Sequence, residues 1–141
     1  MILLDTNVVS EPLRGTPETR VIDWIDAQAL ETLYLSAITV AELRAGVARL
    51  PKGRRRTGLH ESLESQVLPL FAGRVRPFDL DCTSAYAELI AKARSSGQAI
   101  AAADGYIAAI AISNGFTVAT RDVSPFEAAG AKVINPWEWA G

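Results

Sequence analysis

The amino-acid sequence predicts an α/β protein in which helices cover both faces of a parallel sheet, a three-layer α/β/α sandwich. Two observations lead to this prediction. Short, continuous apolar runs alternate along the chain with longer segments in which apolar residues recur every three or four positions. The chain has 141 residues and 49% hydrophobic content, which suffices for one well-filled core but not for two ordinary domains. Residues 1–141 are therefore expected to form a single domain.

The apolar runs are the expected strands. Residues 2–4 form a continuous apolar run that ends at Asp5, as is typical of a central strand buried on both faces. The remaining strands are expected at residues 33–35, 74–78, 116–120 and 132–134. Because helices are expected between these strands, the sheet is predicted to be parallel.

The segments between the runs have the apolar period of helices. A first helix is expected to begin near Pro17. Ser36 or Thr39 can cap a second helix, which carries Glu42 in its first turn. A third amphipathic segment spans residues 59–73 and ends near its glycine.

Three more helices are expected in the second half of the chain. Asp81 can cap one that finishes before Gly97. Residues 102–114 form another, with Asp104 in its first turn, and a short one lies near residues 125–129. These helices complete the two outer layers of the predicted sandwich.

Four acidic residues stand where ligands usually bind in parallel sheets, beyond the carboxyl ends of the strands. Asp5 and Asp122 each follow a predicted strand, whereas Glu42 and Asp104 lie near the starts of helices. Carboxylates gathered in one place repel one another, and a hard divalent cation such as Mg²⁺ or Mn²⁺ relieves that repulsion. Such a cation can activate water and hydrolyse a phosphodiester, which makes a nuclease the expected chemistry.

Each acid also has an ordinary structural explanation. Asp5 and Asp122 are good turn residues, and the helix dipole favours Glu42 and Asp104 near helix N-termini. The joint interpretation is stronger, because apolar residues lead directly into Asp5 and Glu42, and an unpaired charge beside buried surface is costly.

Composition limits the cellular setting. The single cysteine, Cys82, allows no internal disulfide framework and no thiol site for zinc, which suits a reducing cytoplasm. The first residues lack a basic stretch, and no apolar run reaches membrane-spanning length, so neither secretion nor membrane insertion is expected. The formal net charge of −2 means that any nucleic-acid-binding face must be local.

Four segments, in order, resemble the successive motifs of VapC toxins, which are PIN-domain proteins. They are residues 1–11 (MILLDTNVVSE), 35–46 (LSAITVAELRAG), 103–109 (ADGYIAA) and 118–122 (VATRD). Asn135, Pro136 and Trp137 are similar to the FitB branch of that family. One such motif would be weak, but four in the family's order and spacing are specific and extend over essentially the whole chain.

The resemblance implies a PIN-type sheet of strand order 3-2-1-4-5 and a metal-dependent ribonuclease. The residues that match the family's catalytic and metal-binding acids are Asp5, Glu42, Asp104 and Asp122. Thr6 and Thr120 match its small hydroxyl positions, which orient acids or water. Many relatives carry a second acid three residues after the position of Asp122, but Pro125 stands there. Asp122 is thus the acid of this segment expected to serve.

The resemblance also implies a biological role. A chain of this family is an endoribonuclease that acts as the toxin of a type II toxin–antitoxin system, using Mg²⁺ or Mn²⁺. It forms a homodimer, and a VapB-like, DNA-binding antitoxin neutralises it; two such heterodimers can assemble on operator DNA. The alternative is an inactive PIN-fold protein that acts only through binding in the antitoxin and operator-DNA complex.

Two surface features each allow two interpretations, and a third indicates a partner. A basic cluster either steers a phosphate backbone or belongs to a solvated inter-helix loop; it comprises Arg44, Arg49, Lys52, Arg54, Arg55 and Arg56. Arg121 either contacts a scissile phosphate or pairs with a neighbouring acid. The helix pair between Val40 and Phe71 is unusually apolar for a free surface, and it is a candidate groove for an antitoxin helix or strand.

Two other protein classes also place an acid after the first strand. A phosphatase of the haloacid-dehalogenase type requires a second Asp two residues after the nucleophile, where this chain has Asn7. A receiver domain requires a lysine at the end of a late strand, and Lys52, Lys92 and Lys132 are not so placed. Both classes are therefore disfavoured.

Overall fold

The computed structural model describes all 141 residues, and its strands form one five-stranded sheet in the order β3-β2-β1-β4-β5. The strands are β1 (Ile2–Leu4), β2 (Leu33–Ser36), β3 (Val75–Arg76), β4 (Thr117–Ala119) and β5 (Val133–Ile134). Every pairing is parallel, and the central β1 aligns Ile2 with Leu33 of β2 and with Thr117 of β4. The expected fold class, strand order and central first strand are confirmed.

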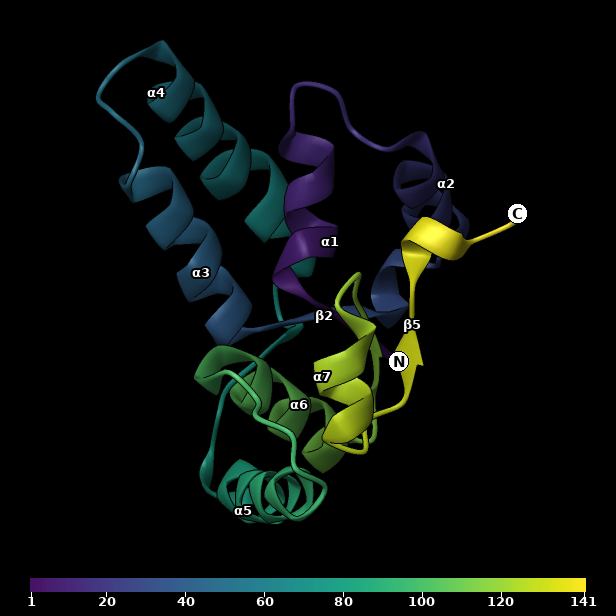
Figure 1. Cartoon of the computed structure of the whole chain (residues 1–141). Coiled ribbons are helices and arrows are strands. Elements are labelled where there is room, and N and C mark those ends of the chain that lie inside the picture. Colours follow the sequence, from purple (N-terminus) through teal and green to yellow (C-terminus); the bar gives the residue numbers. More distant parts are fainter.

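Helices cover both faces of the sheet (Figure 1). One layer holds α1 (Thr6–Ser10), α2 (Thr19–Ala27), α3 (Ala37–Ala48) and α4 (Arg54–Glu61), and the other holds α5 (Leu80–Ser95), α6 (Ala102–Asn114) and α7 (Val123–Ala128). Shorter helical turns are η1 (Glu11–Leu13), η2 (Leu30–Thr32), η4 (Leu68–Phe71) and η5 (Pro136–Glu138), while the π-helical η3 (Ser62–Val67) continues α4. No helix combines the length and apolar character that a membrane crossing requires.

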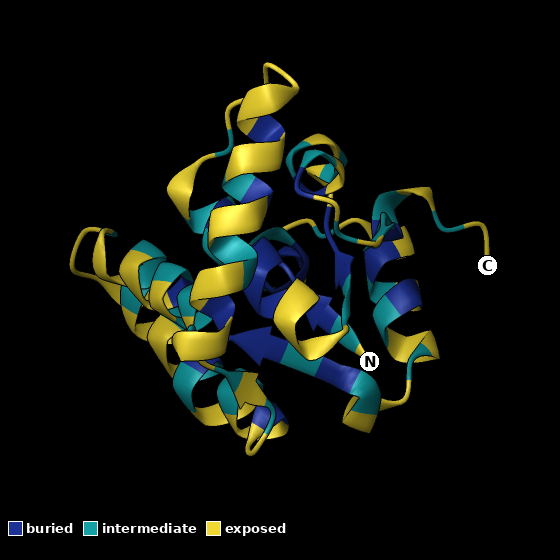
Figure 2. Ribbon diagram, turned by 90° about the horizontal axis from the view of Figure 1, so that it is seen from below, coloured by how far each residue is buried: buried dark blue, intermediate teal, exposed yellow.

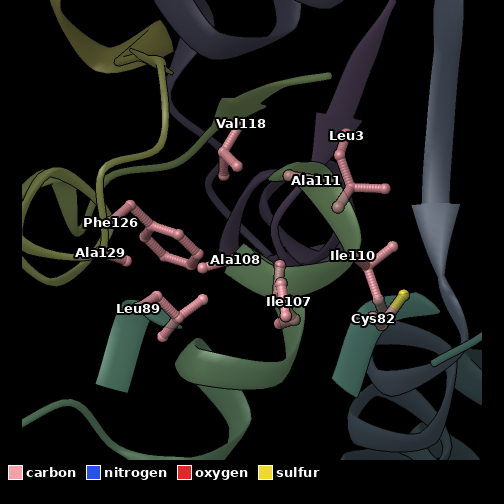
Figure 3. Packing of buried hydrophobic residues seen from close by; sticks show 11 residues of the cluster. Leu3, Cys82, Leu89, Ile107, Ala108, Ile110, Ala111, Val118, Phe126 and Ala129 are labelled. Atoms are coloured by element: carbon pink, nitrogen blue, oxygen red, sulfur yellow. The ribbon is translucent and has the colours of Figure 1, made fainter. Parts of the chain in front are cut away.

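Alternating residues of each strand point to opposite layers, so the sheet separates two cores. Leu3 and Val118 face α5, α6 and α7, where they pack with Ile107 and Phe126 (Figure 3). Their chain neighbours Leu4 and Ala119 face the other layer. There they join buried residues of α1, α2, α3 and the turns after α4: Val8, Val9, Val21, Trp24, Leu43, Leu63 and Phe71.

The three central strands β2, β1 and β4 are largely buried and the outer helix surfaces are exposed, as Figure 2 shows. Helix starts differ from expectation in two places. Ser36 caps α3 by accepting the N–H of Thr39 at 3.0 Å, so the helix begins at Ala37 and Glu42 lies in its second turn. Asp79, rather than Asp81, caps α5, because its carboxylate accepts the N–H of Cys82.

Three further details correct the sequence-based prediction. Arg54 begins α4, so the basic segment there is the first turn of a helix and not a loop. Strand β3 spans only two residues, because Pro77 has no N–H with which to extend the ladder. The five-residue α1 directly after Asp5 was not expected, since a run this short carries no clear helical period.

Candidate active site

Asp5 lies at the point where β1 ends, and its side chain caps α1. It is only 5% exposed. One carboxylate oxygen, Oδ1, accepts the N–H of Thr6 at 2.8 Å, and Oδ2 accepts the hydroxyl of Thr120 at 2.7 Å. Burial, helped by the charges of Asp104 and Glu42, raises the pKa of Asp5 from 3.8 to about 6 despite these bonds.

Glu42 comes to the same place from α3, which follows the neighbouring strand β2. The hydroxyl of Thr6 donates to Oε1 of Glu42 at 2.6 Å and lies 3.2 Å from the hydroxyl oxygen of Thr39. Thr6 therefore links the acid that follows β1 with the acid carried by α3. This contact supports the expectation that Thr6 orients an acidic side chain.

Asp104 lies in the first turn of α6 and is half-buried. Burial raises the pKa of its carboxyl, and the charges of Asp122 and Glu42 add to that effect. Because the charge of Asp104 also reaches Asp5, all four predicted acids belong to one electrostatic cluster. We call Asp5, Glu42, Asp104 and Asp122 the acid cluster.

Asn7 is a site residue that the sequence reasoning did not single out. Its amide nitrogen lies 3.4 Å from both Oδ2 of Asp5 and the hydroxyl oxygen of Thr120, and its Oδ1 accepts the N–H of Arg121 at 3.3 Å. Asn7 thus ties the segment after β1 to the segment after β4. The signal was its position two residues after a buried acid, which we used only to exclude a phosphatase.

Arg121 and Asp122 leave β4 in different directions. The guanidinium of Arg121 lies over the ring of Trp137, with 5.3 Å between its Cζ and the ring centroid, and it forms no salt bridge with an acid. Asp122 is exposed, and its N–H donates to the hydroxyl oxygen of Thr120 at 3.0 Å. Arg121 therefore forms no direct salt bridge with a neighbouring acid, and its contact with a phosphate stays a prediction.

Glu11 is a second residue that the sequence reasoning missed. Its side chain is 4% exposed, accepts the N–H of Glu18 at 2.9 Å and pairs with Arg14 at 3.2 Å. Burial alone would raise the pKa of this carboxyl, but these bonds and the charges of Arg14 and Arg121 hold the pKa below its ordinary value. An acid three residues before an arginine, next to an apolar run, was the available signal.

The acid cluster offers the donors that a hard divalent cation prefers. Its charged groups are all carboxylates, while Cys82 lies in the apolar core and His60 lines a separate hollow between α3 and α4. No three acidic, histidine or cysteine side chains of the chain stand close enough to form a ready-made metal site. Mg²⁺ keeps several of its waters and takes one or two carboxylates directly, so a magnesium site does not require three such side chains in contact.

This combination of fold and site defines a family. The PIN-domain model matches residues 2–132, and the protein belongs to the PIN-domain family. The chain is 67% identical over 138 residues to the plasmid stability protein StbB of Pseudomonas syringae pv. tomato, and 62% identical over 138 residues to the VapC ribonuclease Y4jK of Sinorhizobium fredii. Each alignment covers 98% of this chain and 99% of the relative.

Within the family, the chain groups with the VapC and FitB toxins, as its motifs predict. It is 58% identical to the toxin FitB of Neisseria gonorrhoeae, over 97% of this chain and 99% of FitB. The crystal structure of FitAcB from Neisseria gonorrhoeae superposes with a TM-score of 0.95 at 57% identity, over 99% of this chain and 100% of that one. The structure of FitAB bound to a DNA fragment gives a TM-score of 0.96 at 55% identity, over 100% of this chain and 99% of that one.

Proposed function

We propose that this protein is a divalent-metal-dependent endoribonuclease and the toxin of a type II toxin–antitoxin pair. The observation that carries the proposal is the acid cluster, in which the nearly inaccessible Asp5 has its pKa raised to about 6 by burial and neighbouring carboxylates. The like charges that disfavour ionisation of Asp5 favour the uptake of a cation that neutralises them. Relatives named a ribonuclease and a toxin support the biological assignment.

Asp5, Glu42, Asp104 and Asp122 would hold Mg²⁺ or Mn²⁺, directly or through water. When bound, the ion lowers the pKa of a water molecule and neutralises charge that develops on a phosphodiester. The chain's own part is to orient the acids: the Thr120 hydroxyl fixes Oδ2 of Asp5, and the Thr6 hydroxyl fixes Oε1 of Glu42. The bond from Thr120 favours the ionised form of Asp5 that a cation requires.

The partners we propose follow from the relatives. Structures of FitAB bound to DNA and of VapBC2 of Rickettsia felis bound to a fragment of its promoter support a VapB-like antitoxin that brings the complex to operator DNA. The toxin itself is proposed to be a homodimer, assembled on DNA as two toxin–antitoxin heterodimers. Action on RNA and a free, buried Cys82 would agree with a cytoplasmic setting.

The test is cleavage of purified total RNA by the antitoxin-free protein in Mg²⁺, in Mn²⁺ and in chelator. We expect cleavage with either ion and none in chelator, and we expect Asp5→Asn and Asp104→Asn to abolish it. The matched control is Asp81→Asn, because Asp81, like Asp104, lies in the first turn of a helix, but is exposed on α5.

Cleavage that survives in chelator, or in both purified site variants, would contradict the assignment. Intact RNA under every metal condition would favour an inactive binding module instead. Growth arrest on expression without the antitoxin, relieved by co-expression of an adjacent small DNA-binding protein, tests the toxin role separately. If the protein cleaves RNA but arrests the growth of no host, the nuclease proposal stands and the toxin proposal is rejected.

A further inference from the structure

Two threonine hydroxyls form a path from the protein core to the acid cluster. Thr39 is fully buried, and its hydroxyl oxygen lies 3.2 Å from that of Thr6. The hydroxyl of Thr6 in turn reaches Oε1 of Glu42 at 2.6 Å. Thr39 and Glu42 lie three positions apart on one face of α3, and Thr6 of α1 bridges them. We call Thr39 and Thr6 the hydroxyl chain.

The direction of the hydroxyl chain follows from its hydrogens. Thr6 has a single hydroxyl hydrogen. A contact of 2.6 Å between a hydroxyl and a carboxylate is a charge-assisted hydrogen bond, so this hydrogen must lie between Thr6 and Glu42. The hydrogen between the two threonines must therefore come from Thr39, whose side chain has no other hydrogen-bond partner in the protein. Thr39 donates to Thr6, and Thr6 donates to Glu42.

Thr39 is the fixed end of the hydroxyl chain. Its backbone N–H donates to Oγ of Ser36, the last residue of β2, at 3.0 Å, so the strand and the helix hold it together. Its β-branched side chain also has few allowed rotamers in a helix. Glu42 is only partly buried, and its long side chain has more rotational freedom to lose. The hydrogen bonds therefore run from a rigid residue to a flexible acid and restrain that acid.

We propose that Thr39 is a positioning residue of the acid cluster, which holds the Glu42 carboxylate in place through the hydroxyl of Thr6. This inference rests on the proposed metal-dependent function and adds to it a core residue that touches neither the cation nor RNA. Oε1 of Glu42 accepts the Thr6 hydroxyl, whereas Oε2 accepts no hydrogen bond from the protein. The restraint thus leaves Oε2 available to a cation. Hydrogen-bond partners behind a metal-binding side chain commonly set the affinity of the site.

The experiment measures Mn²⁺ binding to the RNA-free protein from the loss of the electron paramagnetic resonance signal of the free ion. Thr39→Val keeps the size and branching of the side chain and removes the hydroxyl. Loss of a direct partner commonly weakens metal affinity about 10- to 100-fold, which we expect for Thr6→Val. Thr39 lies one bond further away, so we expect Thr39→Val to weaken affinity by about three- to tenfold. Thr39→Ser retains the hydroxyl and should bind Mn²⁺ like the wild-type protein.

A double variant tests whether Thr39 acts through Thr6. Once Thr6→Val has removed the bridging hydroxyl, Thr39→Val should cause no further loss of Mn²⁺ affinity, whereas independent effects would multiply. The matched control is Thr83→Val. Thr83 is also a helical threonine, but it is exposed on α5 and donates its hydroxyl hydrogen to the carbonyl oxygen of Leu80. We expect this control to leave Mn²⁺ affinity unchanged.

Thermal unfolding in chelator separates positioning from a purely structural role. Loss of a buried hydrogen bond lowers the melting temperature of Thr39→Val in either case. A lower melting temperature with unchanged Mn²⁺ affinity would overturn the inference, as would equal weakening by Val and Ser at position 39, or losses that multiply in the double variant.

Failure of the proposed function has a different signature. A wild-type protein that cleaves no RNA would contradict the nuclease, while Mn²⁺ binding and its dependence on Thr39 would still be measured and would support the positioning role. A wild-type protein that binds no Mn²⁺ would overturn both proposals.

Discussion

Thr120 donates its hydroxyl hydrogen to Oδ2 of Asp5 over 2.7 Å, and this bond joins the ends of two adjacent strands across 115 positions of sequence. The same hydroxyl oxygen accepts the N–H of Asp122. A single buried side chain therefore orients one acid of the cluster and the backbone of another. This geometry makes Thr120 the most informative residue to change without altering charge.

Thr120→Val keeps the shape of the side chain and removes the hydroxyl. Asp5 then loses a hydrogen bond that lowers its pKa, so we expect the acid limb of the activity profile to move to higher pH. Loss of an orienting partner typically weakens metal affinity about 10- to 100-fold. Metal titration of RNA cleavage at several pH values measures both effects. Thr120→Ser retains the hydroxyl and should keep the wild-type pH profile and metal affinity. Equal defects in the Val and Ser variants would indicate that Thr120 acts only through packing.

Asp5→Asn should stabilise the protein in chelator. The folded-state pKa of Asp5 is raised from 3.8 to about 6, so the folded protein binds this proton more tightly than the unfolded chain does. Stability is therefore lost as pH rises through that interval, by roughly 3 kcal/mol at most. Thermal unfolding at several pH values should show the variant to be more stable above pH 6, with the difference disappearing below pH 3.8. A difference that grows toward low pH would contradict this.

Glu11→Gln should have the opposite pH dependence. The pKa of Glu11 is held below its ordinary value of 4.5, so its charge stabilises the folded protein above that pH and this contribution is lost as pH falls through the folded-state pKa. We expect a loss of about 1–2 kcal/mol at pH 7 that disappears in acid. Urea unfolding measures it. Glu64→Gln, which breaks a more exposed pair, is the control and should change little.

Gly105→Ala should destabilise the protein by about 1–2 kcal/mol. An added Cβ would lie 3.1 Å from a ring carbon of Tyr86, and that ring packs against Phe78 and Tyr106, so it has little room to move. The strain should exceed the gain of up to about 1 kcal/mol that alanine brings to a helix. Gly46→Ala in α3 meets nothing closer than 4.0 Å and should show that gain alone. Thermal unfolding of both variants separates the two effects.

The fold was largely predictable because its strands are apolar runs bounded by polar residues. The helix of residues 102–114 was predicted with both ends correct, and Gly115, with a positive φ of 71°, accounts for its C-terminal end. The boundaries that failed depend on single contacts. Asp79 and Asp81 are equally good capping residues in sequence, and only the folded chain determines which carboxylate reaches the N–H of Cys82.

The acid cluster was predictable as a set of residues but not as an arrangement. Strand ends and family motifs located Asp5 and Asp122, and the metal-binding role of all four acids stays a prediction. Asn7 was missed because its three contacts come from a segment more than 100 positions away or from its own turn. Glu11 was missed because an acid usually lies in solvent, and its burial depends on Arg14 and the backbone of Glu18.

The two edge strands of the sheet have a consequence for how this protein meets other chains. β3 and β5 contain two residues each, so an incoming strand would find too few free backbone groups on either side to hold its register. Growth of the sheet by addition of strands, the usual first step toward fibrils and domain exchange, is thereby suppressed. A partner must therefore bind to side chains on the helical surfaces. Those side chains differ from one protein to another, whereas backbone geometry at a sheet edge does not, so they determine which partner binds.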